Sequence, residues 1–219
     1  MKVELISYTQ PPPSPAEGST SSLQDLVAYC ARVSNPQNQS NTETNEKLIR
    51  YLIKNHHWSP LEMVSVCLEI QTTRDIARQI LRHRSFSFQE FSQRYAVVDM
   101  GFENKVARIQ DKKNRQNSIE VEEPTLELEW QAQQDVVNQT AMTAYQWALD
   151  KGIAKEQARS VLPEGTTISR LYMNGTLRSW VHYIQLRSAN GTQREHMEVA
   201  KACAKAIEPI FPMISEFVQ

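Results

Sequence analysis

The sequence contains little of what marks a membrane protein, a disulfide framework or a dinucleotide fold. Its 219 residues include three cysteines, Cys30, Cys67 and Cys203, which are scattered along the chain and odd in number. Such cysteines predict free, buried thiols in a reducing compartment. The six glycines are too dispersed for a glycine-rich dinucleotide or phosphate loop. No run of residues approaches the roughly 20 apolar positions that a membrane helix requires.

Neither sign of charge is in excess. The chain has 24 Lys+Arg against 25 Asp+Glu, which gives a net charge of -1 at pH 7. Because nucleic-acid-binding proteins usually show a basic excess, we expect no nucleic-acid partner. The lack of a membrane-length apolar run predicts no membrane partner. The first residues lack the apolar run of a secretion signal, which predicts a cytoplasmic protein. Paired cysteines and His-Glu-x-x-His spacing are also missing, so no metal site is predicted.

No composition shift divides the chain, so we predict one domain over residues 1–219. Alternating apolar residues predict strands near residues 3–6, 62–71 and 166–173. The expected fold class is α+β, with an antiparallel or mixed sheet and long helices. Helical spacing and caps predict helices over residues 22–31, 44–55, 73–84, 124–151, 155–162, 176–187 and 192–207.

Finer features are predicted within these elements. Prolines at 11–15 predict an exposed connector, and Ser59, which precedes a proline, is expected to begin an extended run. Trp130 and Val137 are expected on the inner face of the longest helix. Arg74 is expected to point away from the core, and Asn174-Gly175 is expected to turn the chain.

Residues 82–95, Arg-His-Arg-Ser-Phe-Ser-Phe-Gln-Glu-Phe-Ser-Gln-Arg-Tyr, combine cations with aromatic rings. Apolar rings cost free energy in water, and a core does not hold unpaired cations. This mixture indicates a pocket for a flat, anionic ligand. A simpler interpretation of the first three residues is that cations are favoured at a helix C-terminus. Whether the phenylalanines stack on a ligand or pack the loop stays open.

Arginines at predicted element ends and turns support the same interpretation. Their side chains can converge on one cleft, and a guanidinium binds two phosphate oxygens at once. Together they predict an anion pocket for a nucleotide. A nucleotide- or RNA-phosphate-binding protein without catalysis is the alternative from another functional class. The six arginines are Arg82, Arg84, Arg94, Arg159, Arg178 and Arg187.

The spacing Arg82-His83-Arg84, seven residues, then Ser92 resembles the R-H-R-x7-S signature of flavin-dependent thymidylate synthases. Arg94 also matches that family's extended pattern. The segment His57-x-Ser59-Pro60-x-Glu62 is similar to an upstream family motif. Further blocks follow in the family's order, namely Ala158-Arg159-x-x-Leu162-Pro163, Arg178-Ser179, Leu186-Arg187 and Gln193-x-Glu195.

The resemblance implies an enzyme that converts deoxyuridine monophosphate (dUMP) to thymidylate (dTMP). In that family, 5,10-methylenetetrahydrofolate donates the carbon, and NADPH reduces a bound flavin adenine dinucleotide (FAD) that supplies the hydride. The implied partners are therefore dUMP, a folate and further copies of the same chain. Members of the family are homotetramers whose active sites are built from several subunits.

The resemblance also assigns residues to the two nucleotides. The FAD-binding set is Ser59, Arg82, His83, Arg84, Glu90, Thr176, Arg178 and His182. The dUMP-binding set is Gln79, Arg82, Glu90, Phe91, Ser92, Gln93, Arg94, Arg159 and Arg187.

Arg187 is the residue to which the resemblance gives a catalytic role. A cation beside the uracil imide stabilises the ring anion and lowers its pKa. Ser92 is interpreted as a substrate ligand rather than a nucleophile, because its neighbours offer no suitable base. The chain departs from the usual family residues at Met63, Thr176 and His182.

Overall fold

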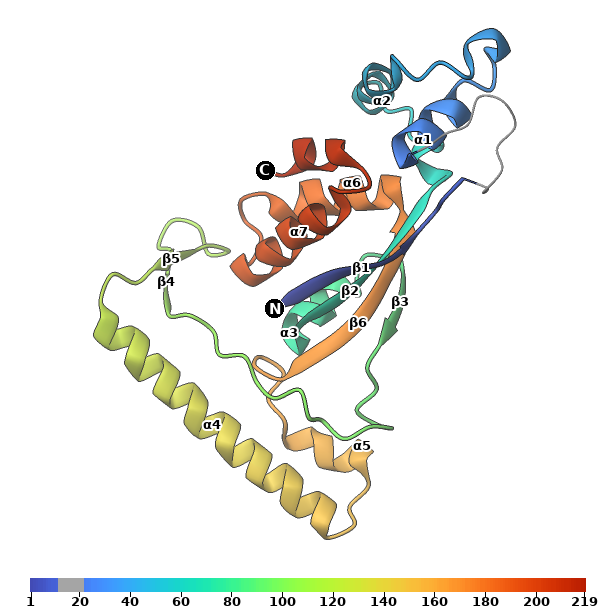
Figure 1. Ribbon diagram of the computed structural model, residues 1–219. Helices are drawn as coiled ribbons and strands as arrows, with labels where there is room; N and C mark the ends of the chain where they lie inside the picture. Colours follow the sequence, from blue (N-terminus) through green and yellow to red (C-terminus); the bar gives the residue numbers. More distant parts are fainter. Residues whose placement is uncertain (12–21) are drawn as a thin grey trace.

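The computed structural model describes residues 1–11 and 22–219, and Figure 1 shows how their helices and strands are arranged. The predicted proline-rich connector at residues 11–15 lies outside the described residues except for its first position. Within the described ranges, no helix is both long and apolar enough to cross a membrane.

The central sheet has four strands: β1 (Lys2–Tyr8), β2 (Ser65–Thr73), β3 (Ser87–Glu90) and β6 (Ile168–Thr176). They lie in the order β1-β2-β6-β3, and every neighbouring pair is antiparallel. β2 and β6 pair over their full lengths, from Ser65 opposite Thr176 to Thr73 opposite Ile168. Alternate β2 side chains are buried, because successive strand residues point to opposite faces and one face carries the core.

Three helices pack on this sheet: α3 (Arg74–Ile80), α6 (Leu177–Ser188) and α7 (Arg194–Ile207). Figure 1 shows α6 and α7 side by side, with the C-terminal 3-10 helix η4 (Pro212–Phe217) against them. α3 follows β2 directly and contacts both β2 and β6. The chain between α3 and β3 therefore turns at the sheet, which is where residues 82–85 lie.

Different helices lie at the two ends of the sheet. At one end, α1 (Leu23–Ala31) packs on α2 (Asn45–Lys54) and on η2 (Ser59–Glu62), which also contacts α6. At the other end, α4 (Pro124–Asp150) stands apart from the sheet (Figure 1). The remaining elements are η1 (Pro36–Asn38), β4 (Arg108–Gln110), β5 (Ser118–Glu120), α5 (Lys155–Ala158) and η3 (Arg159–Val161).

The main hydrophobic core fills the space between the sheet and helices α6 and α7. Trp180, Tyr183 and Phe211 are among its largest side chains, and each is at most 1% exposed. Full burial of each such side chain contributes about 1.5–3 kcal/mol. A smaller cluster lies beneath α4 and consists of Val98, Tyr145, Ala148, Ala158 and Leu162.

The structure confirms the α+β class and the antiparallel sheet, but the predicted inner face of α4 is wrong at two positions. Trp130 and Val137 are 42% and 55% exposed, whereas Gln134 and Asn138 are buried. The reason is that this face meets peptide groups: Gln134 donates to the Lys105 carbonyl and accepts from its N–H, at 2.9 and 2.7 Å. Amides therefore replace apolar side chains at these positions.

The predictions for Ser59 and for Asn174-Gly175 are also wrong. Ser59 begins the 3-10 helix η2, because a proline at the next position suits the first turn of a helix. Asn174 and Gly175 continue β6: both pair with β2, and Asn174 also pairs with β3. Gly175 is required there by the ring of Phe86, which lies against its Cα.

The contact between Gly175 and Phe86 generates a prediction for stability. A Cβ at Gly175 would lie 2.6 Å from Phe86 Cε1, and Phe86 is itself packed edge-on against Trp180 at 4.9 Å between ring centroids. We expect Gly175→Ala to lower the free energy of unfolding by about 1–3 kcal/mol, measured by urea denaturation. Gly165→Ala is the matched control, because no atom lies within 4 Å of its added Cβ. Equal stability of the two variants would contradict this packing.

Candidate active site

The turn formed by Arg82–Ser85 separates its three cationic side chains. Arg82 and Arg84 are exposed, whereas His83 is half-buried. Ser179 on α6 donates a hydrogen bond to the last carbonyl of the turn at 3.2 Å, which ties the turn to the beginning of that helix. The two arginines are therefore exposed to a ligand, whereas His83 is engaged with the protein.

His83 contacts Arg187, the residue assigned the catalytic role. Arg187 Nε donates to His83 Nε2 at 2.9 Å, so His83 is a neutral acceptor with its proton on Nδ1. Burial, and then the charge of Arg187, lower the pKa of His83 from 6.5 to about 4. The terminal nitrogens of Arg187 make no hydrogen bond to the described residues, so they can face a ligand.

The rest of the FAD set, apart from Glu90, gathers where β6 ends and α6 begins. Thr176 caps α6 by accepting from Ser179 N at 3.3 Å. Arg178 forms an ion pair with Glu62 on η2, the helix that begins at Ser59. His182 meets the edge of the Trp58 ring at 4.4 Å between centroids. Burial and the Arg178 charge lower the pKa of His182.

Gln79, from the dUMP set, lies at the end of α3 among buried polar side chains. Its Nε2 donates to Gln193 Oε1 at 2.7 Å, and its Oε1 lies 3.2 Å from Nδ1 of His196. His196 is fully buried on α7. The amide of Gln79, on α3, is therefore held by two residues at the beginning of α7.

Glu90 is engaged in an ionic cluster at the end of β3. Its carboxylate accepts from Ser169 Oγ at 2.8 Å and from Arg78 at 2.9 Å. Arg74 lies 3.9 Å from Glu90 and donates to Glu164 at 3.0 Å. The prediction that Arg74 points away from the core is wrong, because its side chain is 8% exposed and lies between these two carboxylates.

The remaining dUMP residues, Phe91 to Arg94 and Arg159, lie beyond the end of β3. Phe91 N donates to the carbonyl of Arg170 on β6 at 2.8 Å, and a turn begins at Ser92. Gln93 is buried. Arg94 and Arg159 meet at one residue: Arg94 pairs with the Glu156 carboxylate at 3.4 Å, and Arg159 donates to the Glu156 carbonyl at 3.4 Å.

The single chain therefore has two separate groups of predicted site residues. The FAD group lies around Thr176, and the Phe91–Arg94 group lies beside Arg170 on the same strand. Six residues of β6 separate these points, a span of about 20 Å. Glu90 lies at the Arg170 end, opposite Leu171 and bonded to Ser169. In the described residues, a single chain therefore places the two groups at different points along β6.

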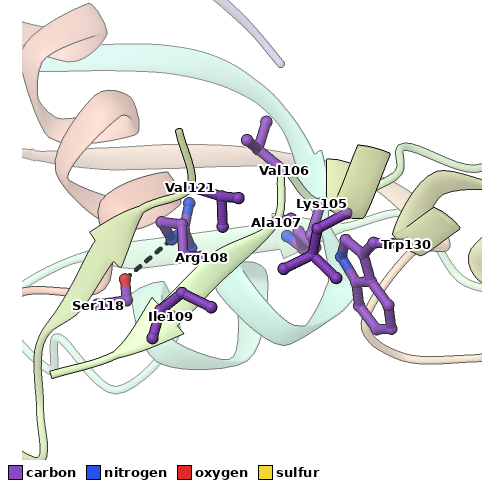
Figure 2. Close-up of a pocket in the computed structure, with 9 residues that line it drawn as sticks. Lys105, Val106, Ala107, Arg108, Ile109, Ser118, Val121 and Trp130 are labelled. Carbon is purple, nitrogen blue, oxygen red and sulfur yellow. Dashed lines mark hydrogen bonds between the residues drawn. The ribbon is translucent and has the colours of Figure 1, made fainter. Parts of the chain in front are cut away.

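Two neighbouring pockets lie beside α4, and none of the residues predicted to bind FAD or dUMP lines either of them. Figure 2 shows the first, of about 470 Å³, with Arg108 Nε donating to Ser118 Oγ at 2.9 Å across the β4–β5 hairpin. The second, of about 370 Å³, shares Arg108 and Trp130 with the first and reaches Gln193 and Glu195. In the part of the chain that the structure describes, no group of three His, Cys, Asp or Glu residues is arranged to hold a metal ion.

Sequence reasoning missed four polar residues that support these groups. All four side chains are buried or nearly so. Arg74 donates to Glu164, Arg108 donates to Glu195, and Tyr183 and His196 bond to each other. The helical spacing could have indicated that His196 is buried, because it lies three and four residues before the buried Val199 and Ala200 of α7. Arg108 gives no such signal, because its partner Glu195 is 87 residues away.

The comparisons with known proteins agree with this arrangement of motifs. The family model described as thymidylate synthase complementing protein matches residues 18–213. A probable flavin-dependent thymidylate synthase of Paramecium bursaria Chlorella virus 1 is 47% identical over 99% of this chain and 98% of its own. The chain belongs to the flavin-dependent thymidylate synthase family. This confirms the resemblance inferred from the R-H-R-x7-S spacing.

A second curated relative and a solved structure are also similar over nearly the whole chain. The flavin-dependent thymidylate synthase of Synechocystis sp. is 46% identical, and the alignment covers 98% of both chains. Among solved structures, the UMP/dUMP methylase PolB from Streptomyces cacaoi, bound with 5-Br dUMP, superposes with a TM-score of 0.82 at 27% identity. That superposition covers 99% of this chain and 93% of the methylase, so the fold is shared throughout.

Neutral buried histidines in the site predict a dependence of stability on pH. Burial, and then the charges of Arg187 and His83, lower the pKa of His196 from 6.5 to about 3. The unfolded chain takes up protons near pH 6.5, whereas folded His83 and His196 do not do so until about pH 4 and 3. The free energy of unfolding should therefore fall as the pH is lowered from about 6.5 towards 4.

Urea denaturation at pH 7.5 and pH 5 tests this expectation. His83→Gln should show a smaller loss of stability between these pH values than the unmodified protein. His57→Gln, which replaces an exposed histidine, should leave the loss unchanged. An identical pH dependence in the His83→Gln variant would show that His83 is not held neutral in the fold.

Proposed function

We propose that the chain is a flavin-dependent thymidylate synthase that carries out the reductive methylation of dUMP to dTMP. It uses 5,10-methylenetetrahydrofolate as the carbon donor, FAD as its cofactor and NADPH as the reductant of the FAD. Residues 1–219 form one domain for this reaction. The observation that carries the proposal is the contact of Arg187 with the R-H-R turn, which joins the two most specific family motifs in one place.

The residues around the beginning of α6 fit FAD by their chemistry. Exposed Arg82 and Arg84 can neutralise its diphosphate, and Arg178 can exchange its carboxylate partner for a phosphate or hydroxyl group. Ser59, Thr176 and Glu90 supply further polar groups, while His83 and His182 supply ring edges. FAD bound here would supply the hydride for the reduction.

The residues beyond β3 suit the phosphate and sugar of dUMP. Arg94 and Arg159 converge on one residue, Glu156, and a phosphate dianion can replace that weak partner because the Arg94–Glu156 pair is exposed. Ser92 can donate its hydroxyl to the same phosphate. Glu90, Phe91 and Gln93 complete this group, and Gln79 and Arg187 approach from α3 and α6.

Arg187 is the residue that we assign to the chemistry at the uracil ring. Its cation stabilises the ionised imide. The ionised ring has a higher electron density at the carbon that accepts the methylene unit. Cysteine attack on uracil is a poor alternative, since burial raises the pKa of the Cys30, Cys67 and Cys203 thiols. Because thiolates are the nucleophilic form, these cysteines are poorly suited to attack. The three free thiols also support a reducing, cytoplasmic location.

We propose that four copies of the chain assemble so that different chains contribute the separated groups to one site. Exposed apolar side chains on α4 support this assembly: Leu128, Val136 and Trp147 are 70%, 63% and 59% exposed. At about 100° per residue they lie opposite the side that carries buried Ala141 and Tyr145. A helix with apolar residues on both sides is favourable only when both sides are covered.

Binding of RNA without catalysis is less well supported. Three arginines in or beside the site face a carboxylate: Arg78 with Glu90, Arg94 with Glu156 and Arg178 with Glu62. Such pairs interrupt the continuous basic surface that a nucleic-acid backbone requires. They suit a small anion that replaces one carboxylate at a time.

The proposal is tested by assaying the purified, FAD-loaded protein for NADPH oxidation and dTMP formation with dUMP and methylenetetrahydrofolate. Product should form only when both substrates are present. Arg187→Ala should lower kcat/KM by about 10²–10³-fold, because one charged group that stabilises the transition state is lost. Arg50→Ala, at a surface ion pair with Glu216, is the control and should remain active. Bound flavin without dTMP formation would reject the proposed function.

A further inference from the structure

A continuous line of hydrogen-bonded side chains connects α6, α7, α3 and β4. Tyr183 OH lies 3.1 Å from His196 Nε2, and His196 Nδ1 lies 3.2 Å from Gln79 Oε1. Gln79 Nε2 donates to Gln193 Oε1 at 2.7 Å, and Gln193 Nε2 donates to Glu195 Oε2 at 3.0 Å. Tyr183 and His196 are at most 1% exposed, so this end of the line is closed to water.

The carboxylate of Glu195 determines which group donates and which accepts at each step of the line. Glu195 is paired with Arg108, whose NH2 donates to its other oxygen at 2.6 Å. An ionised carboxylate only accepts, so Gln193 must present its N–H to Glu195 and its oxygen to Gln79. Gln79 must then donate to Gln193, which leaves its own oxygen facing His196.

The same reasoning assigns the tautomer of His196. Because Gln79 Oε1 can only accept, His196 Nδ1 must carry the proton, and Nε2 of the neutral ring accepts from the hydroxyl of Tyr183. Burial lowers the pKa of His196 and raises that of Tyr183, so a neutral imidazole and a protonated phenol are both favoured. Each contact within the line therefore pairs one donor with one acceptor.

Among the described residues, the second N–H of Gln79 Nε2 has no acceptor. Turning the amide over would place its NH₂ against the N–H of His196 and its oxygen against the oxygen of Gln193. Both contacts are repulsive, and a buried group without a partner is costly. Gln79 therefore presents a hydrogen-bond donor in one orientation, on a helix rather than a mobile loop.

We propose that His196 is a positioning residue that, together with Tyr183 and Gln193, holds Gln79 as a fixed hydrogen-bond donor to dUMP. The inference rests on the proposed function, which places dUMP at Gln79. The acceptors that it fits are the phosphate, sugar and carbonyl oxygens of the nucleotide. A pre-oriented donor binds more tightly than a rotating amide, since less freedom is lost on binding.

The tautomer can be measured without any substrate. Long-range ¹H–¹⁵N NMR of the FAD-loaded protein with ¹⁵N-labelled histidine should show His196 neutral and protonated at Nδ1 at pH 7. The His196→Asn variant assigns the signal by its loss. A proton on Nε2 would overturn the inference, whether or not the protein makes dTMP.

Kinetics with two substitutions at His196 separate positioning from packing. The side-chain N–H of Asn takes the place of the ring Nδ1–H, whereas Leu offers no donor. We expect His196→Leu to raise the KM for dUMP by about tenfold or more, and His196→Asn by less than about threefold. kcat should change less than KM in both variants, because the folate and flavin contacts are retained.

Both variants lose the bond to Tyr183, so thermal unfolding and flavin content serve as controls. If the two variants are equally stable but differ in KM as stated, positioning is supported. If KM changes equally in both, or in neither, the inference is wrong. Failure of the unmodified protein to make dTMP would instead reject the proposed function, and the NMR measurement would still decide the tautomer.

Discussion

The antiparallel pairing of β2 with β6 is the constraint on which the rest of the structure depends. β6 lies between β2 and β3, so its register determines which residues lie beside each other on both sides. At one end of β6, Thr176 caps α6 and brings Arg178 and His182 beside η2. At the other end, the carbonyl of Arg170 holds the segment that begins at Phe91. A shift of one residue would turn every side chain of this strand to the opposite face.

Burial distinguishes the arginines that support the fold from those that suit a ligand. The side chains of Arg74 and Arg108 are 8% and 13% exposed, and loss of a carboxylate partner there would leave a desolvated charge. Those of Arg94 and Arg178 are 55% and 41% exposed, where an ion pair contributes only about 0–1 kcal/mol. A phosphate can therefore displace the carboxylate from an exposed arginine at little cost.

Local patterns in the sequence predicted the elements well but predicted contacts between distant elements poorly. The helices predicted over residues 22–31 and 192–207 depend on neighbours three or four residues away, and α1 and α7 confirm both within about two residues. The buried position of Arg74 depends on Glu164, which is 90 residues away. Gly175 resembles a turn residue locally, yet it lies within a strand because the ring of Phe86 needs its space.

The same limit applied to the candidate site. The R-H-R-x7-S spacing identified the family, but it treats Arg82 and Ser92 as parts of one motif. In the fold, Arg82 belongs to the group at the beginning of α6 and Ser92 to the group beyond β3. Only the pairing of β3 with β6 reveals that separation. His196 was missed because a lone histidine on an apolar helix face carries no local sign of its partners.

The central claim is that one active site combines groups from different chains. The most direct test mixes two variants that should each be inactive, Arg178→Ala in the group at the beginning of α6 and Arg94→Ala in the group beyond β3. In randomly mixed assemblies, about a quarter of the active sites should take an intact group from each of two chains and so recover dTMP formation. No recovery in assemblies shown to contain both variants would contradict the account, because each site would then lie within a single chain.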